Sequence, residues 1–102
     1  MTAPKTALWI AHVHVTDPDR YGQYAKRATD IIPAHGGVWL VRAGRYETLE
    51  GPDRSRQVVA RFPSVEAAVA CYLSPEYQEA LSFAEGAAER DLVIVEENAA
   101  PS

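Results

Sequence analysis

The chain has 102 residues, 47% of them hydrophobic and 24% charged, with a net charge of −4. This length predicts a single domain, residues 1–102, and the composition is typical of a globular protein rather than a disordered one. The acidic balance argues against nucleic acid or an anionic membrane surface as a partner, because either needs clustered positive charge. The single cysteine excludes an intramolecular disulfide. Because no signal peptide and no apolar stretch of ~20 residues is present, we expect a cytoplasmic protein outside the membrane.

The ends of the chain and the first predicted strand differ sharply in composition. Residues 1–6 and 98–102 are small and polar with proline, which is typical of flexible tails, so we expect an ordered core over about 7–97. From Leu8 to Val15 two sets of residues alternate. One set is Leu8, Ile10, His12 and His14, and the other is Trp9, Ala11, Val13 and Val15. This period of two predicts a β-strand.

A helix is predicted directly after this strand. Asp17 is placed to cap it, and Pro18 can occupy its first position, where a missing N–H has no consequence. Six residues then recur at the spacing of one helical face: Tyr21, Tyr24, Ala25, Ala28, Ile31 and Ile32. Pro33 and the sequence HGG at 35–37 predict the end of the helix.

The second half of the chain predicts three further strands and an interrupted helix. Strands are expected at 38–43, 56–62 and 92–95. Residues 45–50 either extend the first of these strands or form an arm before a turn at 51–53. The helical face that begins after Ser64 is interrupted at Ser74-Pro75-Glu76, a fresh capping sequence, and then continues to Ala84.

The order strand, helix, strand, strand, helix, strand predicts an α+β fold, a ferredoxin-like βαββαβ sandwich with both helices on one face of the sheet. The other face would remain bare although its strands carry apolar residues. Because a bare apolar face needs a partner, we expect a homodimer in which a second copy covers it.

Five segments resemble a bacterial family, the domain of unknown function 1330, which is placed in the dimeric α+β-barrel superfamily. They are VTDPDRYGQY at 15–24, HGGVWLVRAG at 35–44, LEG at 49–51, RFPSVEAAVACYLSPEYQEA at 61–80 and DLVIVE at 91–96. The resemblance implies a two-chain barrel with the helices outside. Superfamily relatives include cofactor-free monooxygenases, lactone isomerases, cyclases and binding proteins, so it does not select a reaction. Two positions depart from the family pattern, Arg61 in place of glutamate and Ala84 in place of arginine, and a family site that uses them would be altered here.

His12 and His14 are the first candidates for chemistry. On a strand, a spacing of two places both imidazoles on one side, ~6.6 Å apart. Imidazole titrates near neutrality and suits acid–base work, although the pair can equally be hydrogen-bonded barrel or interface residues. A metal site would need a third ligand, and nothing shows that His35 reaches the pair. We expect neither a metal nor an organic cofactor.

Arg42 and a set of aromatic residues complete the candidate site. Arg42 could hold a carboxylate or enolate oxygen, or it could pair with Glu47, Glu50 or the partner chain, whereas Arg56 and Arg61 are interpreted as surface or interface charges. The aromatic set could line an apolar pocket between sheet and helices, or simply form core, and it comprises Tyr24, Trp39, Tyr46, Tyr72 and Tyr77. Cys71 is interpreted as buried and inert.

Together these residues suggest a cofactor-independent enzyme that acts on a small organic molecule by proton transfer, isomerisation or cyclisation. In this hypothesis one histidine is the base, Arg42 holds the anion and the aromatic residues form the walls. The alternative is a non-catalytic homodimer that binds a small molecule or acts as a scaffold. Convergent side chains around a cavity of ~300 Å³ or more would favour an enzyme or a binding protein, and a filled cleft would favour a scaffold.

Overall fold

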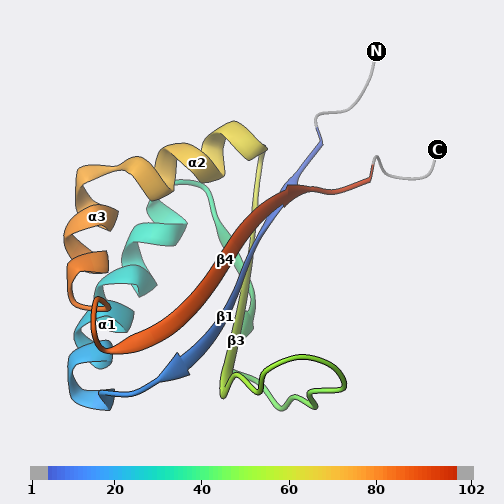
Figure 1. Ribbon diagram of the computed structural model, residues 1–102. Coiled ribbons are helices and arrows are strands. Elements are labelled where there is room, and N and C mark those ends of the chain that lie inside the picture. The colour runs from blue at the N-terminus through green and yellow to red at the C-terminus, as the bar shows by residue number, and fades with distance from the viewer. Residues whose placement is uncertain (1–4, 99–102) are drawn as a thin grey trace.

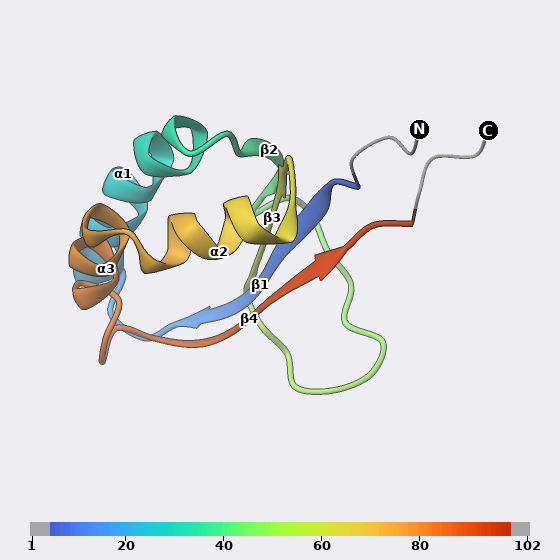
Figure 2. The same cartoon turned by 90° about the horizontal axis from the view of Figure 1, so that it is seen from above.

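The computed structural model describes residues 5–98, and the ends predicted to be flexible at 1–4 and 99–102 lie outside the described residues. The elements in chain order are β1 (Ala7–Val15), α1 (Pro18–Ala34), β2 (Val38–Arg42), β3 (Arg56–Phe62), α2 (Val65–Leu73), α3 (Pro75–Ser82) and β4 (Ala88–Glu96). The strands form one sheet in the order β2-β3-β1-β4, and every neighbouring pair is antiparallel. The three helices lie on one face of this sheet (Figures 1 and 2). The predicted ferredoxin-like α+β fold is confirmed.

Strand β1 supplies the centre of the core. Its alternate residues Trp9 and Val13 are at most 2% exposed, whereas His12 and His14 on the other face are exposed. The Trp9 ring contacts Phe62 of β3 and Tyr77 of α3, with centroids 5.7 and 5.1 Å away. The predicted alternation therefore separates a face covered by helices from a bare face.

The helix boundaries follow the predicted caps. The Asp17 carboxylate accepts a hydrogen bond from the Arg20 amide at 3.2 Å, and Pro18 is the first residue of α1. Pro33 lies in the last turn of α1, and Gly36 adopts the left-handed conformation with φ of 90°. The Ser74 hydroxyl accepts from the Tyr77 amide at 3.2 Å, which divides the interrupted helix into α2 and α3.

Strand β2 contains a β-bulge that decides where its last side chain points. Trp39 pairs with Ala60 and Val41 pairs with Val59, so Leu40 between them has no partner in the ladder. An extra residue reverses the alternation beyond it. As a result Trp39 and Arg42 share the helix side of the sheet.

Three expectations about boundaries need correction. Strand β4 runs from Ala88 to Glu96, longer than the predicted 92–95, because β1 pairs with it along its whole length. Residues 43–55 form no helix or strand, and β2 ends at Arg42. Thr6, assigned to the tail, exchanges hydrogen bonds with Glu97: its hydroxyl donates to the carboxylate at 2.6 Å, and its carbonyl accepts from the Glu97 amide at 2.9 Å. Within residues 5–98, no helix has the length and apolar character needed to cross a membrane.

Candidate anion-binding site

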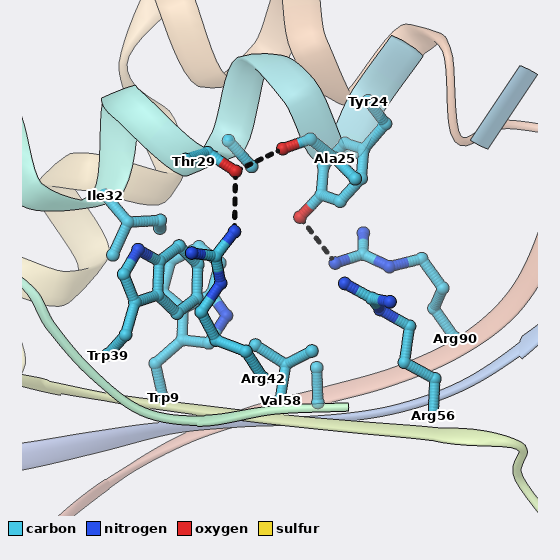
Figure 3. A pocket seen from close by; sticks show the side chains of 12 residues that line it. Trp9, Tyr24, Ala25, Thr29, Ile32, Trp39, Arg42, Arg56, Val58 and Arg90 are labelled. Atoms are coloured by element: carbon cyan, nitrogen blue, oxygen red, sulfur yellow. Dashed lines mark hydrogen bonds between the residues drawn. The ribbon is translucent and has the colours of Figure 1, made fainter. Parts of the chain in front are cut away.

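A cleft between α1 and the sheet brings three arginines together (Figure 3). Arg42 comes from the end of β2, Arg56 from the start of β3 and Arg90 from β4. The rest of the lining is uncharged and consists of Trp9, Ala11, Tyr24, Ala25, Ala28, Thr29, Ile32, Trp39 and Val58. We call this site the arginine cleft. Its enclosed space is about 30 Å³, enough for roughly two water molecules.

Arg42 closes one end of the arginine cleft. Its guanidinium donates a hydrogen bond to the Thr29 hydroxyl at 2.8 Å and lies 4.9 Å from the centre of the Trp39 ring. The Thr29 hydroxyl in turn donates to the Ala25 carbonyl at 2.8 Å. The Arg42 side chain is thus held by a hydroxyl and an indole ring, and the predicted alternative of an ion pair with Glu47 or Glu50 does not occur. Ala43, the next residue, has φ of 56°, a conformation that non-glycine residues rarely adopt.

Several N–H groups at the arginine cleft have no hydrogen-bond acceptor. The Trp39 Nε1, Arg56 Nε and Arg90 Nε atoms are buried and unpartnered within residues 5–98. A buried donor without an acceptor costs free energy, and a water molecule or a ligand oxygen within reach would remove that cost. Arg56, interpreted from the sequence as a surface or interface charge, is instead one of the residues that line this site.

At the other end of the cleft, Arg90 contacts two tyrosines. Its guanidinium donates to the Tyr24 hydroxyl at 3.0 Å and to the Tyr77 hydroxyl at 3.3 Å, and the two hydroxyl oxygens lie 2.6 Å apart. Burial raises the pKa of Tyr24 well above its usual value and also raises the pKa of Tyr77, while Arg90 acts in the opposite direction on both. Both phenols therefore remain protonated near neutral pH and can donate hydrogen bonds.

The two histidines lie on the other face of the sheet. His12 contacts Gln57 of β3, with 2.9 Å between its Nδ1 and the amide oxygen, and His14 is exposed. His12 lines a separate groove of about 480 Å³ together with Arg54, Asp91 and Tyr46. The structure therefore does not bring the histidine pair together with Arg42, and the assignment of one of them as a base stays a prediction.

The predicted aromatic set divides among three places. Tyr24 and Trp39 line the arginine cleft, and Tyr77 lies fully buried behind Tyr24. Tyr46 lies in the groove with His12. Tyr72 borders a third hollow, of about 400 Å³, which is also lined by Leu81 of α3 and Leu92 of β4. Two of the five residues, Tyr24 and Trp39, thus share the arginine cleft, and Tyr46 lies apart from it because the segment at 43–55 extends on the bare side of the sheet (Figure 1).

The two departures from the family pattern also have defined places. Arg61 is exposed and pairs with Glu97, and its Nε and Nη2 donate to the carboxylate at 2.7 and 3.1 Å. Ala84 is 3% exposed and borders the third hollow, which Arg90 also lines. Arg61 therefore lies outside the arginine cleft, and the position of Ala84 is close to Arg90.

Sequence reasoning missed Arg90, although the chain contains a signal for it. On β4 the residues Ala88, Arg90, Leu92 and Ile94 face the helices, and all four are partly buried. An arginine inside an otherwise apolar strand face is unusual and indicates a functional or paired charge. Because the sequence predicts a strand only over 92–95, it does not indicate that Arg90 lies on the same strand face as Leu92 and Ile94. Within residues 5–98, no group of three or more His, Cys, Asp or Glu side chains could hold a metal ion.

A family model for the domain of unknown function (DUF1330) matches residues 6–98. The chain belongs to the DUF1330 family. This confirms the resemblance drawn from the sequence, and it leaves the activity open, since the DUF1330 description names no reaction. No curated protein matches this DUF1330 chain in sequence.

Solved structures with the same fold as this DUF1330 chain include proteins with and without a described activity. A protein of unknown function from Rhodopseudomonas palustris, RPA0582, is 21% identical with a TM-score of 0.70, over 93% of this chain and 84% of its own. A dimeric ferredoxin-like protein of unknown function from Thermobifida fusca is 18% identical with a TM-score of 0.63, over 95% of each chain. SnoaB from Streptomyces nogalater, described as a cofactor-independent oxygenase, is 12% identical with a TM-score of 0.62, over 96% and 99%. At these identities the similarity shows the shared fold alone.

Proposed function

We propose that the arginine cleft binds a small organic anion and that the protein acts on this anion as a cofactor-independent enzyme. One observation carries the proposal: three guanidinium groups line a small cleft that no carboxylate lines, in a chain of net charge −4. Like charges gathered in a partly buried site repel one another, and a bound anion offsets that repulsion. The guanidinium groups that line the cleft supply N–H donors for its oxygen atoms.

The same groups suit reactions that pass through an oxyanion. Preorganised donors aimed at a developing negative charge lower the barrier to forming an enolate or a similar intermediate. Proton transfer, isomerisation and cyclisation next to a carbonyl group all form such intermediates. That SnoaB, a protein of the same fold, is described as a cofactor-independent oxygenase agrees with chemistry of this general kind.

The volume of the cleft limits what enters it. The enclosed 30 Å³ falls short of the ~300 Å³ expected for a pocket that surrounds a whole ligand, and this small volume favours the scaffold alternative over an enzyme. A ligand would therefore place only its polar end inside the cleft. The remainder of the molecule would lie at the mouth, beside the exposed Arg42 side chain.

A non-catalytic binding protein is the second candidate, and the position of the histidines favours it. The arginine cleft contains no group that titrates near neutral pH, because His12 and His14 lie on the opposite face. A reaction in the cleft would therefore need a proton acceptor from the substrate itself. Deuterium exchange at the methylene carbon of phenylpyruvate in D₂O, followed by NMR, separates the two candidates. Exchange no faster than in buffer favours the binding protein.

We also propose that the bare face of the sheet pairs with a second copy of the chain. Val41, Val59, Ile10 and Val93 lie directly opposite one another and form an apolar row across all four strands. Val41 and Val93 are 37% and 54% exposed. The Thermobifida fusca protein of the same fold is described as dimeric, which agrees with a pairing of this kind.

Binding of benzoate, measured by isothermal titration calorimetry, tests the anion site. Loss of a charged hydrogen-bonding group lowers affinity by about tenfold or more, so we expect R56Q to show that loss. R61Q is the matched control, because Arg61 lies on the same strand but outside the cleft, and it should bind like the wild type. The proposal is wrong if benzoate does not bind or if both variants lose affinity equally. Native mass spectrometry of the purified protein would then show whether another ligand is retained.

A further inference from the structure

The two tyrosine hydroxyls beside Arg90 can share their hydrogen atoms in only one favourable way. Each hydroxyl has one hydrogen to donate, and the contact of 2.6 Å between Tyr24 and Tyr77 uses one of the two. Arg90 has no acceptor and donates to both oxygens. One phenol hydrogen therefore remains, and it needs an acceptor elsewhere.

The burial of the two rings decides which hydroxyl keeps the free hydrogen. Tyr77 is fully buried, and within residues 5–98 its hydroxyl forms hydrogen bonds only with Tyr24 and Arg90. If Tyr24 donated to Tyr77, the Tyr77 hydrogen would be buried without an acceptor, which is unfavourable. If Tyr77 donates to Tyr24, the Tyr24 hydrogen is free at the arginine cleft, which Tyr24 lines. Figure 3 shows the Tyr24 hydroxyl pointing toward the arginine side chains.

We infer that the anion is the carboxylate of a 2-oxo acid and that the Tyr24 hydroxyl donates a hydrogen bond to its oxo oxygen. This inference rests on the anion-binding function proposed above. The guanidinium groups hold the carboxylate, and Tyr24 adds a neutral donor beside them. Tyr24 and the three arginines line the same small cleft of about 30 Å³, so an oxygen that reaches Tyr24 while the carboxylate contacts the guanidinium groups would lie on the carbon next to the carboxylate.

The cleft distinguishes an oxo group from a hydroxyl group through its shortage of acceptors. Of the residues that line it, two have a side-chain oxygen, Tyr24 and Thr29, and these oxygens already accept from Arg90 and Arg42. A 2-hydroxy acid would bring a hydroxyl hydrogen into a site whose side chains supply mostly donors, with one lone pair of Thr29 left to accept. A site of this kind rejects a group whose hydrogen bonds it cannot satisfy.

Three ligands with the same phenyl ring and carboxylate test this selectivity: phenylglyoxylate, phenylacetate and mandelate. At the carbon next to the carboxylate, phenylglyoxylate has an oxo group, phenylacetate has no oxygen and mandelate has a hydroxyl group. By calorimetry we expect phenylglyoxylate to bind about fivefold or more tightly than the other two, since one neutral hydrogen bond changes affinity by about that factor. Y24F should abolish the preference for phenylglyoxylate over phenylacetate, because the ratio of the two affinities depends on the oxo group alone. Y77F is the matched control, because it keeps the Tyr24 hydroxyl and should keep the preference.

The outcomes separate this inference from the function on which it rests. Equal affinity for all three ligands, with the R56Q loss retained, overturns the inference and leaves the anion site standing. Mandelate that binds as tightly as phenylglyoxylate overturns it as well. Absence of binding by every ligand contradicts the anion site itself. The comparison of ligands on the wild-type protein needs no variant, so the test holds even if Y24F does not fold.

Discussion

Val93 lies at the β4 end of the apolar row in the proposed dimer interface, and two substitutions there give a graded test. Full burial of a valine side chain is worth ~1.5–3 kcal/mol. Val93 is 54% exposed in the single chain. Burying this exposed part on pairing contributes roughly half of the full burial energy, about 1 kcal/mol per chain. A twofold axis presents the residue twice, which gives about 2 kcal/mol per dimer, or at most ~30-fold in Kd for V93A. V93D places two carboxylates in an apolar interface, at a cost of several kcal/mol, and should abolish the dimer.

Light scattering and sedimentation over a range of concentrations measure this effect. The wild type should have twice the chain mass of 11.2 kDa at micromolar concentration. The control is L73D: Leu73 is 65% exposed, but it lies on α2, on the other side of the sheet, so its dimer should persist. A wild-type mass near 11.2 kDa, or a V93D protein as dimeric as L73D, would refute the proposed interface.

Three further predictions concern the fold and its ionisation. Deleting Leu40 removes the extra residue of the bulge and leaves a regular ladder. The variant should therefore fold, and its affinity for benzoate should stay within twofold of the wild type. A monomeric product, or one that does not bind benzoate, would contradict the pairing described for β2. G37A should lose ~1–3 kcal/mol in urea unfolding because its new Cβ would lie 2.6 Å from Ile32 Cγ2, whereas G22A, with nothing within 4 Å, should gain ~0.5–1 kcal/mol. The raised pKa of Tyr24 keeps this phenol protonated in the folded state while the unfolded chain ionises near pH 10, so stability should fall above that pH by about 1 kcal/mol per pH unit. Because the pKa of Tyr77 is raised as well, Y24F should reduce this fall without abolishing it, and an unchanged slope would show that the Tyr24 ring is not buried as described.

Local sequence signals predicted most of the fold because they act over a few residues. The alternation in β1, the Asp17 and Ser74 caps and the glycine after α1 each depend on neighbouring residues, and all appear where the sequence places them. The short estimate of β4 failed for a different reason. Its first half contains Glu89, Arg90 and Asp91, and pairing with β1 rather than intrinsic preference makes this segment a strand.

The candidate site was harder to predict because its geometry depends on long-range pairing. Strict alternation along β2 would place Arg42 on the side opposite Trp39, and only the bulge at Leu40 returns it to the same side. The histidines show a related limit. Alternation correctly places His12 and His14 on one face, but both faces of β1 contain apolar residues, and the sequence does not state which face the helices cover.

The segment 43–55 connects residues of the arginine cleft with the groove on the bare face of the sheet. Arg42 and Arg56, which line the arginine cleft, flank the segment directly, while residues 46–50 within it border the groove. Leu49 in this segment is 88% exposed. If a second chain packs against this segment and favours one conformation of it, that contact also sets the distance between the Arg42 and Arg56 guanidinium groups. Thermodynamic linkage then requires the anion to change the strength of dimerisation by the same factor by which dimerisation changes the affinity for the anion.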